Sequence, residues 1–164
     1  MANITVAKIK AMLKEDTRPH LIDIDLSGLD LSGLDFSGVT CVKGNFNKTA
    51  LVKTKFENAY LSGSSFREAD LNSANFNEAK LENTDFSNSN LLNASLSRAT
   101  LTSAKFFRAN LTEASLTFAN LAGANLQGAN VEAASFFGAD LTNAKTVKAT
   151  FSKAKLDGVI GYKP

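Results

Sequence analysis

The stretch Ala109-Asn110-Leu111-Thr112-Glu113 states a five-residue pattern that recurs without an insertion from Ile24 to Gly158. Counting in fives from Leu26 to Leu156 gives 27 central positions, of which 15 are Leu and 9 are Phe. Ala stands two positions before the centre in 17 of these repeats, and Asp or Asn stands directly before it in 13. This pattern decides the fold of most of the chain.

A repeat of five residues fits neither regular secondary structure. In an α-helix, successive centres would be rotated by roughly 140° and would never form one apolar stripe. In a β-strand, an odd repeat would send successive centres to opposite faces. All the centres reach one core only if the chain bends once per pentapeptide and winds around an axis, which predicts a solenoid.

The positions of the Phe residues indicate how many repeats form one coil. Eight of the nine central Phe residues share a period of ten, and Phe151 is the exception. An even number of repeats per coil is implied, and two repeats would barely enclose a Leu side chain. We therefore predict four pentapeptides per coil and a square cross-section with two opposing Phe-containing columns. One column is Leu26, Phe46, Phe66, Phe86, Phe106, Leu126 and Thr146; the opposite one is Phe36, Phe56, Phe76, Leu96, Leu116, Phe136 and Leu156.

With these repeats the chain resembles the pentapeptide-repeat proteins, whose pattern is commonly written A(D/N)LXX. The resemblance covers about four-fifths of the sequence. It implies an all-β solenoid, a right-handed quadrilateral parallel β-helix of about seven coils, and the handedness comes from the resemblance alone. The family is especially abundant in cyanobacteria, so a bacterial, cyanobacterial-type source is expected, and most members have no established biochemical role. The resemblance therefore predicts the fold far better than the function.

Three segments are expected along the chain: an N-terminal capping helix and junction (1–20), the repeat β-helix (21–158), and a tail that covers the last coil (159–164). Asn3 is the expected N-cap of a helix over Ile4–Glu15, ended by Arg18-Pro19. In the first coil the position normally occupied by Ala holds four large residues, Ile24, Leu29, Leu34 and Val39. We expect the helix to cover this apolar end and its open sheet edge. The alternative is an amphipathic helix that binds a membrane surface or a partner.

Composition indicates one soluble domain in the cytoplasm. No run of residues approaches the ~18 apolar residues of a membrane span, and Lys8, Lys10 and Lys14 interrupt any secretory h-region near the N-terminus. The single Cys41 occupies a central position of the repeat, so we expect a buried, unpaired thiol that packs as a small apolar residue.

No catalytic, metal or cofactor site is expected. His20 is the only histidine, and no nucleophile or ligand cluster accompanies it in the sequence. The glycines recur at the last position of the pentapeptide, which is the spacing of corners rather than of a phosphate-binding loop. We predict a protein that is not an enzyme and that has no small-molecule substrate.

The candidate interaction surface consists of outward aromatic and basic residues: Phe107, Phe118, Phe137, Lys43, Lys48 and Lys53. Phe118 and Phe137 are separated by just under one coil of four pentapeptides, so they are expected on neighbouring coils of one side, where they either anchor a partner or only stabilise each other. The three lysines follow Asp25, Asp30 and Asp35 of the preceding coil, which favours surface ion pairing over a binding site. A second basic group, near the C-terminus, comprises Lys145, Lys148, Lys153 and Lys155.

Two functions remain open. The first is a structural or protein-interaction module, a rigid rod with an unknown protein partner. The second follows from the resemblance: the family's quinolone-resistance proteins imitate B-form DNA and bind type II topoisomerases. A DNA mimic needs excess carboxylates, whereas Ile24–Gly158 contains 13 Lys or Arg and 13 Asp or Glu, and no loops interrupt the repeats. Direct binding of nucleic acid is not expected from a neutral rod. A monomer is predicted, with an end-to-end dimer through the C-terminal coil as the alternative.

Overall fold

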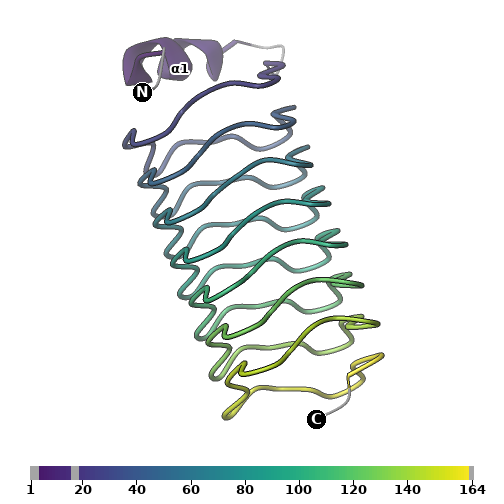
Figure 1. Cartoon of the computed structure of the whole chain (residues 1–164). Coiled ribbons are helices and arrows are strands. Elements are labelled where there is room, and N and C mark those ends of the chain that lie inside the picture. The colour runs from purple at the N-terminus through teal and green to yellow at the C-terminus, as the bar shows by residue number, and fades with distance from the viewer. Residues whose placement is uncertain (1–3, 16–18, 163–164) are drawn as a thin grey trace.

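The computed structural model describes residues 4–15 and 19–162. One helix, α1 (Val6–Met12), lies at the N-terminal end of a stack of similar coils that together form a rod (Figure 1). The coils wind in a right-handed sense from the helix to the C-terminus (Figure 1). The fold is therefore the quadrilateral parallel β-helix that the repeat predicts.

Helix α1 is shorter than the sequence predicts. It begins after Thr5, whose extended backbone and side-chain oxygen form the N-cap; the hydroxyl accepts a hydrogen bond from the Lys8 amide at 3.2 Å. The expected N-cap, Asn3, lies outside the described residues. Thr5 takes that role because a Thr hydroxyl satisfies the amide three residues later, which has no partner inside the helix. Beyond Met12, two amides bond to carbonyls three residues back, a tighter turn that ends the helix.

Parallel pairing links each residue before a centre to its equivalent four pentapeptides later, from His20 with Thr40 to Asp140 with Ile160. The Leu26 amide donates to the Asn45 carbonyl, and the Asn45 amide donates to the Ile24 carbonyl, both at 2.8 Å. Each coil therefore contains four pentapeptides, and the ladder makes about seven coils in all. We name the four faces by the first full coil: face 1 (24–28), face 2 (29–33), face 3 (34–38) and face 4 (39–43), each repeated once in every coil that follows.

The last residue of each pentapeptide forms the corner between two faces. Among the described corners, φ lies between 53° and 61° for twenty non-glycine residues and between 65° and 71° for eight glycines. Side chains disfavour this left-handed conformation, and glycine does not. The expectation that glycine is useful at this position is confirmed, yet most corners hold other residues because the ladder on both sides fixes the backbone.

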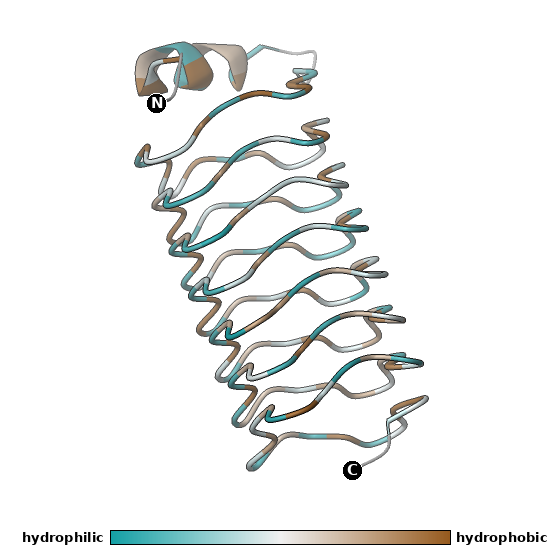
Figure 2. Cartoon of the chain, viewed as in Figure 1, coloured by the Kyte–Doolittle hydropathy of each residue, from teal (hydrophilic) through white to brown (hydrophobic). Residues whose placement is uncertain are grey.

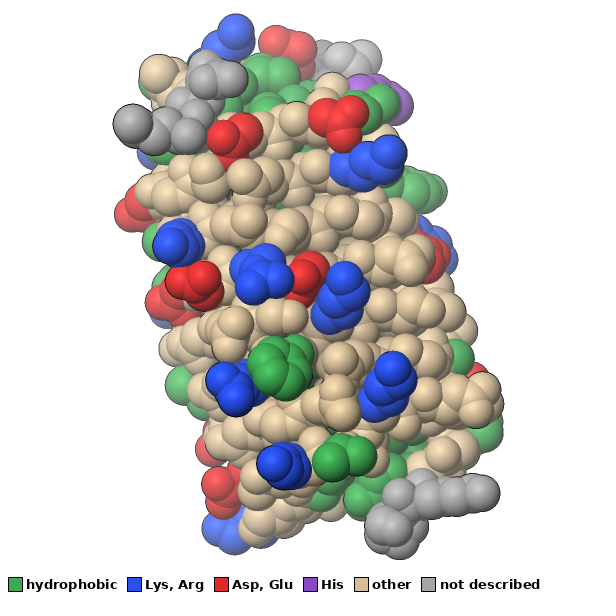
Figure 3. Space-filling model, in the orientation of Figure 1, with side chains coloured by type: hydrophobic (Ala, Val, Ile, Leu, Met, Phe, Trp, Pro, Cys, Tyr) green, Lys and Arg blue, Asp and Glu red, His purple; other side chains and the backbone are tan. Residues whose placement is uncertain are grey.

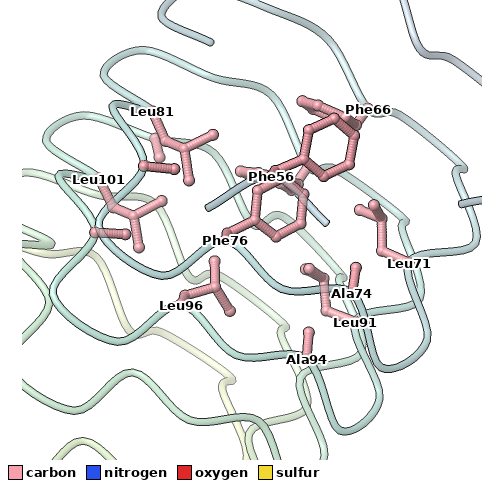
Figure 4. Packing of buried hydrophobic residues seen from close by; sticks show 14 of the residues in the cluster. Phe56, Phe66, Leu71, Ala74, Phe76, Leu81, Leu91, Ala94, Leu96 and Leu101 are labelled. Atoms are coloured by element: carbon pink, nitrogen blue, oxygen red, sulfur yellow. The ribbon is translucent and has the colours of Figure 1, made fainter. Parts of the chain in front are cut away.

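The core contains two opposing ladders of Phe rings, as the period of ten predicts. Within face 1 the rings of Phe46 and Phe66 stack at a centroid distance of 4.5 Å, and within face 3 those of Phe56 and Phe76 stack at 4.8 Å. Across the interior, Phe56 meets Phe66 edge-on at 5.8 Å (Figure 4). Hydrophobic and hydrophilic residues alternate along every coil (Figure 2), so the rings are enclosed while polar side chains face outward.

Polar residues replace Ala at several inward positions without leaving an unsatisfied group. Thr49 donates its hydroxyl hydrogen to the Leu26 carbonyl at 3.1 Å, and Ser64 donates to the Cys41 carbonyl at 2.8 Å. Among the described residues, no buried side-chain nitrogen or oxygen lacks a hydrogen-bond partner. The repeat therefore tolerates hydroxyls inside the rod because a carbonyl of the preceding coil lies within reach.

The two ends of the rod differ in burial. At the N-terminal end, α1 lies over the first coil (Figure 1). Its residue Ile9 is completely buried, and Ile24, Leu29 and Leu34 pack against the core. These contacts support α1 as a cover of the first coil. At the other end the inward residues of the last coil are only partly buried, although the ring of Tyr162 lies 4.9 Å from that of Phe151.

Candidate interaction surface

The predicted contact between Phe118 and Phe137 is confirmed. Their ring centroids are 5.4 Å apart at an angle of 81°, an edge-to-face arrangement, and the side chains are 52% and 47% exposed. Phe118 occupies a corner of face 3, and a Cβ placed on Gly138 one coil later would lie 2.5 Å from its ring. The absent side chain at Gly138 makes room for the ring, so this Phe pair has a fixed position on the rod.

Polar groups surround the Phe pair. The guanidinium of Arg98, one coil before Phe118, lies 5.7 Å from the centre of the Phe118 ring. Beside the rings runs a ladder of hydroxyls in which Ser97, Ser115, Thr117 and Ser135 are linked by distances of 2.9 to 3.2 Å. Arg98 was not among the residues singled out from the sequence, although its place one full coil before Phe118 was a signal for this contact.

Phe107 lies on the opposite side of the rod. It belongs to face 1, whereas Phe137 belongs to face 3, which lies two pentapeptides further around a coil of four. Its ring is 38% exposed and is covered in part by the guanidinium of Arg108, whose central carbon lies 4.9 Å from the ring centre. The structure therefore does not bring Phe107 together with the other two exposed Phe residues.

The three lysines of the candidate surface lie on three different corners. Lys43, Lys48 and Lys53 all have φ of 56° or 57°, and the corners they occupy end faces 4, 1 and 2. Lys48 pairs with Glu68 of the next coil at 3.7 Å, and both side chains are more than half exposed. Such a pair contributes only ~0–1 kcal/mol. The lysines surround the rod rather than forming one patch.

The aspartates of the first coil have a role that the charge pattern did not reveal. Asp25 accepts a hydrogen bond from the Ser27 amide at 3.0 Å, and the side-chain amide of Asn45 donates to the same oxygen at 3.0 Å. Asp30 accepts likewise from the Ser32 amide. The hydrogen bonds from Ser27 and Ser32 hold the pKa of the Asp25 and Asp30 carboxyls below the ordinary value. Asp and Asn precede the centres because they stabilise the turn that follows.

Cys41 is completely buried, and burial raises the pKa of its thiol to about 12. Gly44 replaces the usual Ala nearby, because a Cβ there would lie 2.6 Å from the Cys41 sulfur. A thiol that stays protonated in an apolar site is a poor nucleophile. Cys41 therefore serves packing, as the sequence predicts.

Other kinds of site have no support among the described residues. No group of three or more His, Cys, Asp or Glu side chains there could hold a metal ion. Within residues 4–15 and 19–162, no helix has the length and hydrophobicity needed to span a bilayer. His20 takes part in the first parallel bridge of the ladder.

The geometry is that of a four-sided parallel β-helix built from pentapeptides. Two family models match the sequence, "Pentapeptide repeat region" over residues 39–116 and "Pentapeptide repeats (8 copies)" over residues 134–160. The chain belongs to the pentapeptide-repeat proteins. No curated protein matched its sequence.

Solved structures resemble the rod closely. A trypsin-treated form of QnrB1, a plasmid-mediated fluoroquinolone resistance protein, superposes with a TM-score of 0.81 at 24% identity and covers 87% of this chain and 72% of that one. A pentapeptide repeat protein from the Arabidopsis thaliana thylakoid lumen has 35% identity and a TM-score of 0.50, over 65% of this chain and 70% of that one. The likeness to QnrB1 establishes the fold and does not extend to function.

Proposed function

We propose that this protein is a non-enzymatic interaction module, a rigid rod that binds a protein partner through face 3. The observation that carries the proposal is the exposed pair Phe118 and Phe137, fixed edge-to-face and flanked by Arg98. Aromatic residues and Arg are the residue types most enriched at the energetic centres of protein interfaces. The β-helix holds them in place before binding, which lowers the entropic cost of association.

A pull-down from extract of the source cell tests the proposal. One bait is the wild-type rod and another carries Phe118→Asn and Phe137→Ser; Asn suits the corner because it tolerates the φ of 57° found there. The matched control is Leu92→Ser, which removes an apolar side chain at the same repeat position as Phe137 but on face 2. We expect a partner retained by wild type and control but lost by the double variant. Equal retention by all three baits, or no specific retention, contradicts the proposal.

The second candidate function is binding to a type II topoisomerase, as in the quinolone-resistance proteins of the family. The fold that this chain shares with QnrB1 is the reason to consider it, whereas the 13 basic and 13 acidic residues of Ile24–Gly158 argue against a DNA mimic. A gyrase supercoiling assay with and without a quinolone separates the two. Inhibition or protection at sub-micromolar protein would establish the second function in place of the first.

We also propose that the protein acts in the cytoplasm as a monomer. The alternative is an end-to-end dimer through the C-terminal coil, whose inward residues are only partly buried. Light scattering distinguishes the two, since the monomer has a mass of 17.5 kDa and the dimer twice that.

A further inference from the structure

Face 1 carries a cluster of four cationic side chains in its C-terminal half. Lys105 and Lys145 belong to one bridged column through Asn125, and Arg108 and Lys148 occupy corners of the same face, at equivalent positions two coils apart. Two coils at strand spacing separate such residues by roughly 10 Å. We call these four residues the face 1 cations.

Arg108, Lys145 and Lys148 have no acidic residue beside them on face 1, whereas Lys105 follows Asp85 by one coil in the same bridged column. In the N-terminal half, Lys48 pairs with Glu68 at 3.7 Å and Arg67 with Asp85 at 3.4 Å. In the part of the chain that the structure describes, none of the face 1 cations forms an ion pair. The outward residues between them are the uncharged Asn125, Gln127 and Gly128. Figure 3 shows one face of the rod, on whose lower half Lys or Arg side chains lie beside hydrophobic ones and acidic side chains appear only at the edges.

A groove lies among these residues. It has a volume of about 280 Å³ and is lined by Phe107, Arg108, Gln127, Gly128, Val147 and Lys148. Its floor is low because Gly128 has no side chain; a Cβ there would lie 3.5 Å from Cγ of Arg108, whose stem covers the glycine. Phe107 and the 61% exposed Val147 form apolar walls two coils apart. The groove has room for one apolar side chain between cationic rims.

We propose that this groove binds an acidic segment of a partner protein, with one apolar side chain between Phe107 and Val147 and carboxylates on the face 1 cations. The inference rests on the proposed function and names a second contact surface and the chemistry of its ligand. Charge complementarity favours this occupant, since none of the face 1 cations forms an ion pair in the part of the chain that the structure describes. A nucleic acid fits less well, because its backbone needs a longer basic stripe and offers nothing apolar to the walls.

The preformed cation–π contact strengthens this assignment. The guanidinium of Arg108 lies 4.9 Å from the Phe107 ring, which fixes its position at the groove while its donors remain available to a carboxylate. Lys105, Lys145 and Lys148 are flexible point charges that suit the rim. The surface thus has an aromatic and Arg centre with a Lys border, the arrangement typical of protein recognition.

The test uses a short labelled peptide of Asp and Glu with one central Leu, titrated against the full chain by fluorescence anisotropy at low salt. Arg108→Asn with Lys148→Asn removes two rim charges. The control is Lys43→Asn with Lys53→Asn, which removes two charges from corners with the same φ, 56° and 57°, on other faces. We expect the first pair to weaken binding about tenfold and the control less than about twofold. Melting temperatures equal to wild type exclude unfolding as the cause.

The experiment is completed by comparing three ligands, which are the Leu peptide, a Ser peptide and an oligonucleotide, and by recording an NMR spectrum of the backbone amides. We expect the Leu peptide to bind more tightly than the same peptide with central Ser and than a single-stranded oligonucleotide, and to shift the backbone amide signals of Gln127 and Gly128. Phe107→Ser should remove the preference for Leu, whereas Phe137→Ser, at the same repeat position on face 3, should not. The inference is overturned if the peptide does not bind, or if the two double variants lose the same affinity for it. It is also overturned if the oligonucleotide binds more tightly than the peptide, or if the amide shifts are confined to other faces. Such a result would leave the pull-down test of Phe118 and Phe137 unaffected, because that test concerns face 3. The two proposals can therefore fail separately.

Discussion

The ring of Phe46 lies nearly parallel to the ring of Phe66 one coil later, with centroids 4.5 Å apart and an angle of 6° between the planes. Phe66 stacks in turn on Phe86 and meets Phe56 and Phe76 edge-on, at centroid distances from 5.1 to 5.8 Å. Identical residues thus stack along a face while opposite faces interlock. The coil of four pentapeptides is what brings these rings into register.

Replacing Phe66 by Leu should therefore cost more stability than the same change at Phe136. Both rings are completely buried, but among the described residues Phe66 has four aromatic partners whereas Phe136 has a single tilted contact with Phe151. Aromatic pairs contribute ~0.5–1.5 kcal/mol each beyond burial, so we expect losses of ~2–3 kcal/mol for Phe66→Leu and ~1 kcal/mol for Phe136→Leu. Urea unfolding measures both, and equal losses would mean that ring stacking does not stabilise the coil.

At the corner Ala133, a change to Gly should stabilise the protein. Ala133 has φ of 55°, a conformation in which a Cβ is disfavoured, and glycine relieves that strain by ~0.5–1 kcal/mol. The neighbouring Ala134 points into the core and is completely buried, so Ala134→Gly should instead destabilise by a similar amount. Thermal melting of the two variants should move in opposite directions; a lower melting temperature for Ala133→Gly would contradict this account of the corners.

The corners also illustrate what the sequence could and could not predict. The Phe period of ten predicted the opposing columns, and a spacing of just under one coil predicted the contact of Phe118 with Phe137, because a regular repeat converts spacing directly into position. Gly28 and its equivalents indicated the corners in the sequence. The residue types of Lys43 and Arg98, in contrast, do not predict the left-handed backbone conformation that both adopt. The backbone there is imposed by hydrogen bonds to neighbouring coils. The groove on face 1 was missed because its lining residues must be considered across three coils together.

The thiol of Cys41 should react with a disulfide reagent at pH 8 only when the protein unfolds. Its pKa is about 12 in the folded protein, against an ordinary value of 9.0, because burial disfavours the thiolate. The neutral thiol thus favours the folded state below pH 9, and this contribution is lost as the pH rises from 9 towards 12. Rapid reaction of the native protein would place the thiol in contact with solvent, and guanidinium-unfolded protein is the control.

Loss of the Ile9 side chain should uncover the first coil. Ile9 is the completely buried residue of α1, so Ile9→Ala should lower stability by ~2–4 kcal/mol. The control is Lys8→Ala, at an exposed position of the same helix, for which we expect a change within ~0.5 kcal/mol. If both variants melt with the wild type, α1 does not stabilise the rod, and the alternative of a membrane-binding or partner-binding helix gains support.

The most direct test of the four-sided coil compares two deletions. Removing 62–66 keeps the five-residue register but rotates the rest of the rod by one face, which places Leu71 over Phe46 and Phe76 over Leu51. Removing 62–71 rotates it by two faces and places Phe76 over Phe46, so that Phe still stacks on Phe.

Mismatched core neighbours cost ~1–3 kcal/mol each, while shortening a solenoid costs only in proportion to the coil removed. We therefore predict that the ten-residue deletion, although larger, has the higher melting temperature in calorimetry. An equal melting temperature, or a higher one for the five-residue deletion, would contradict the claim that the opposing Phe columns determine how the coils stack.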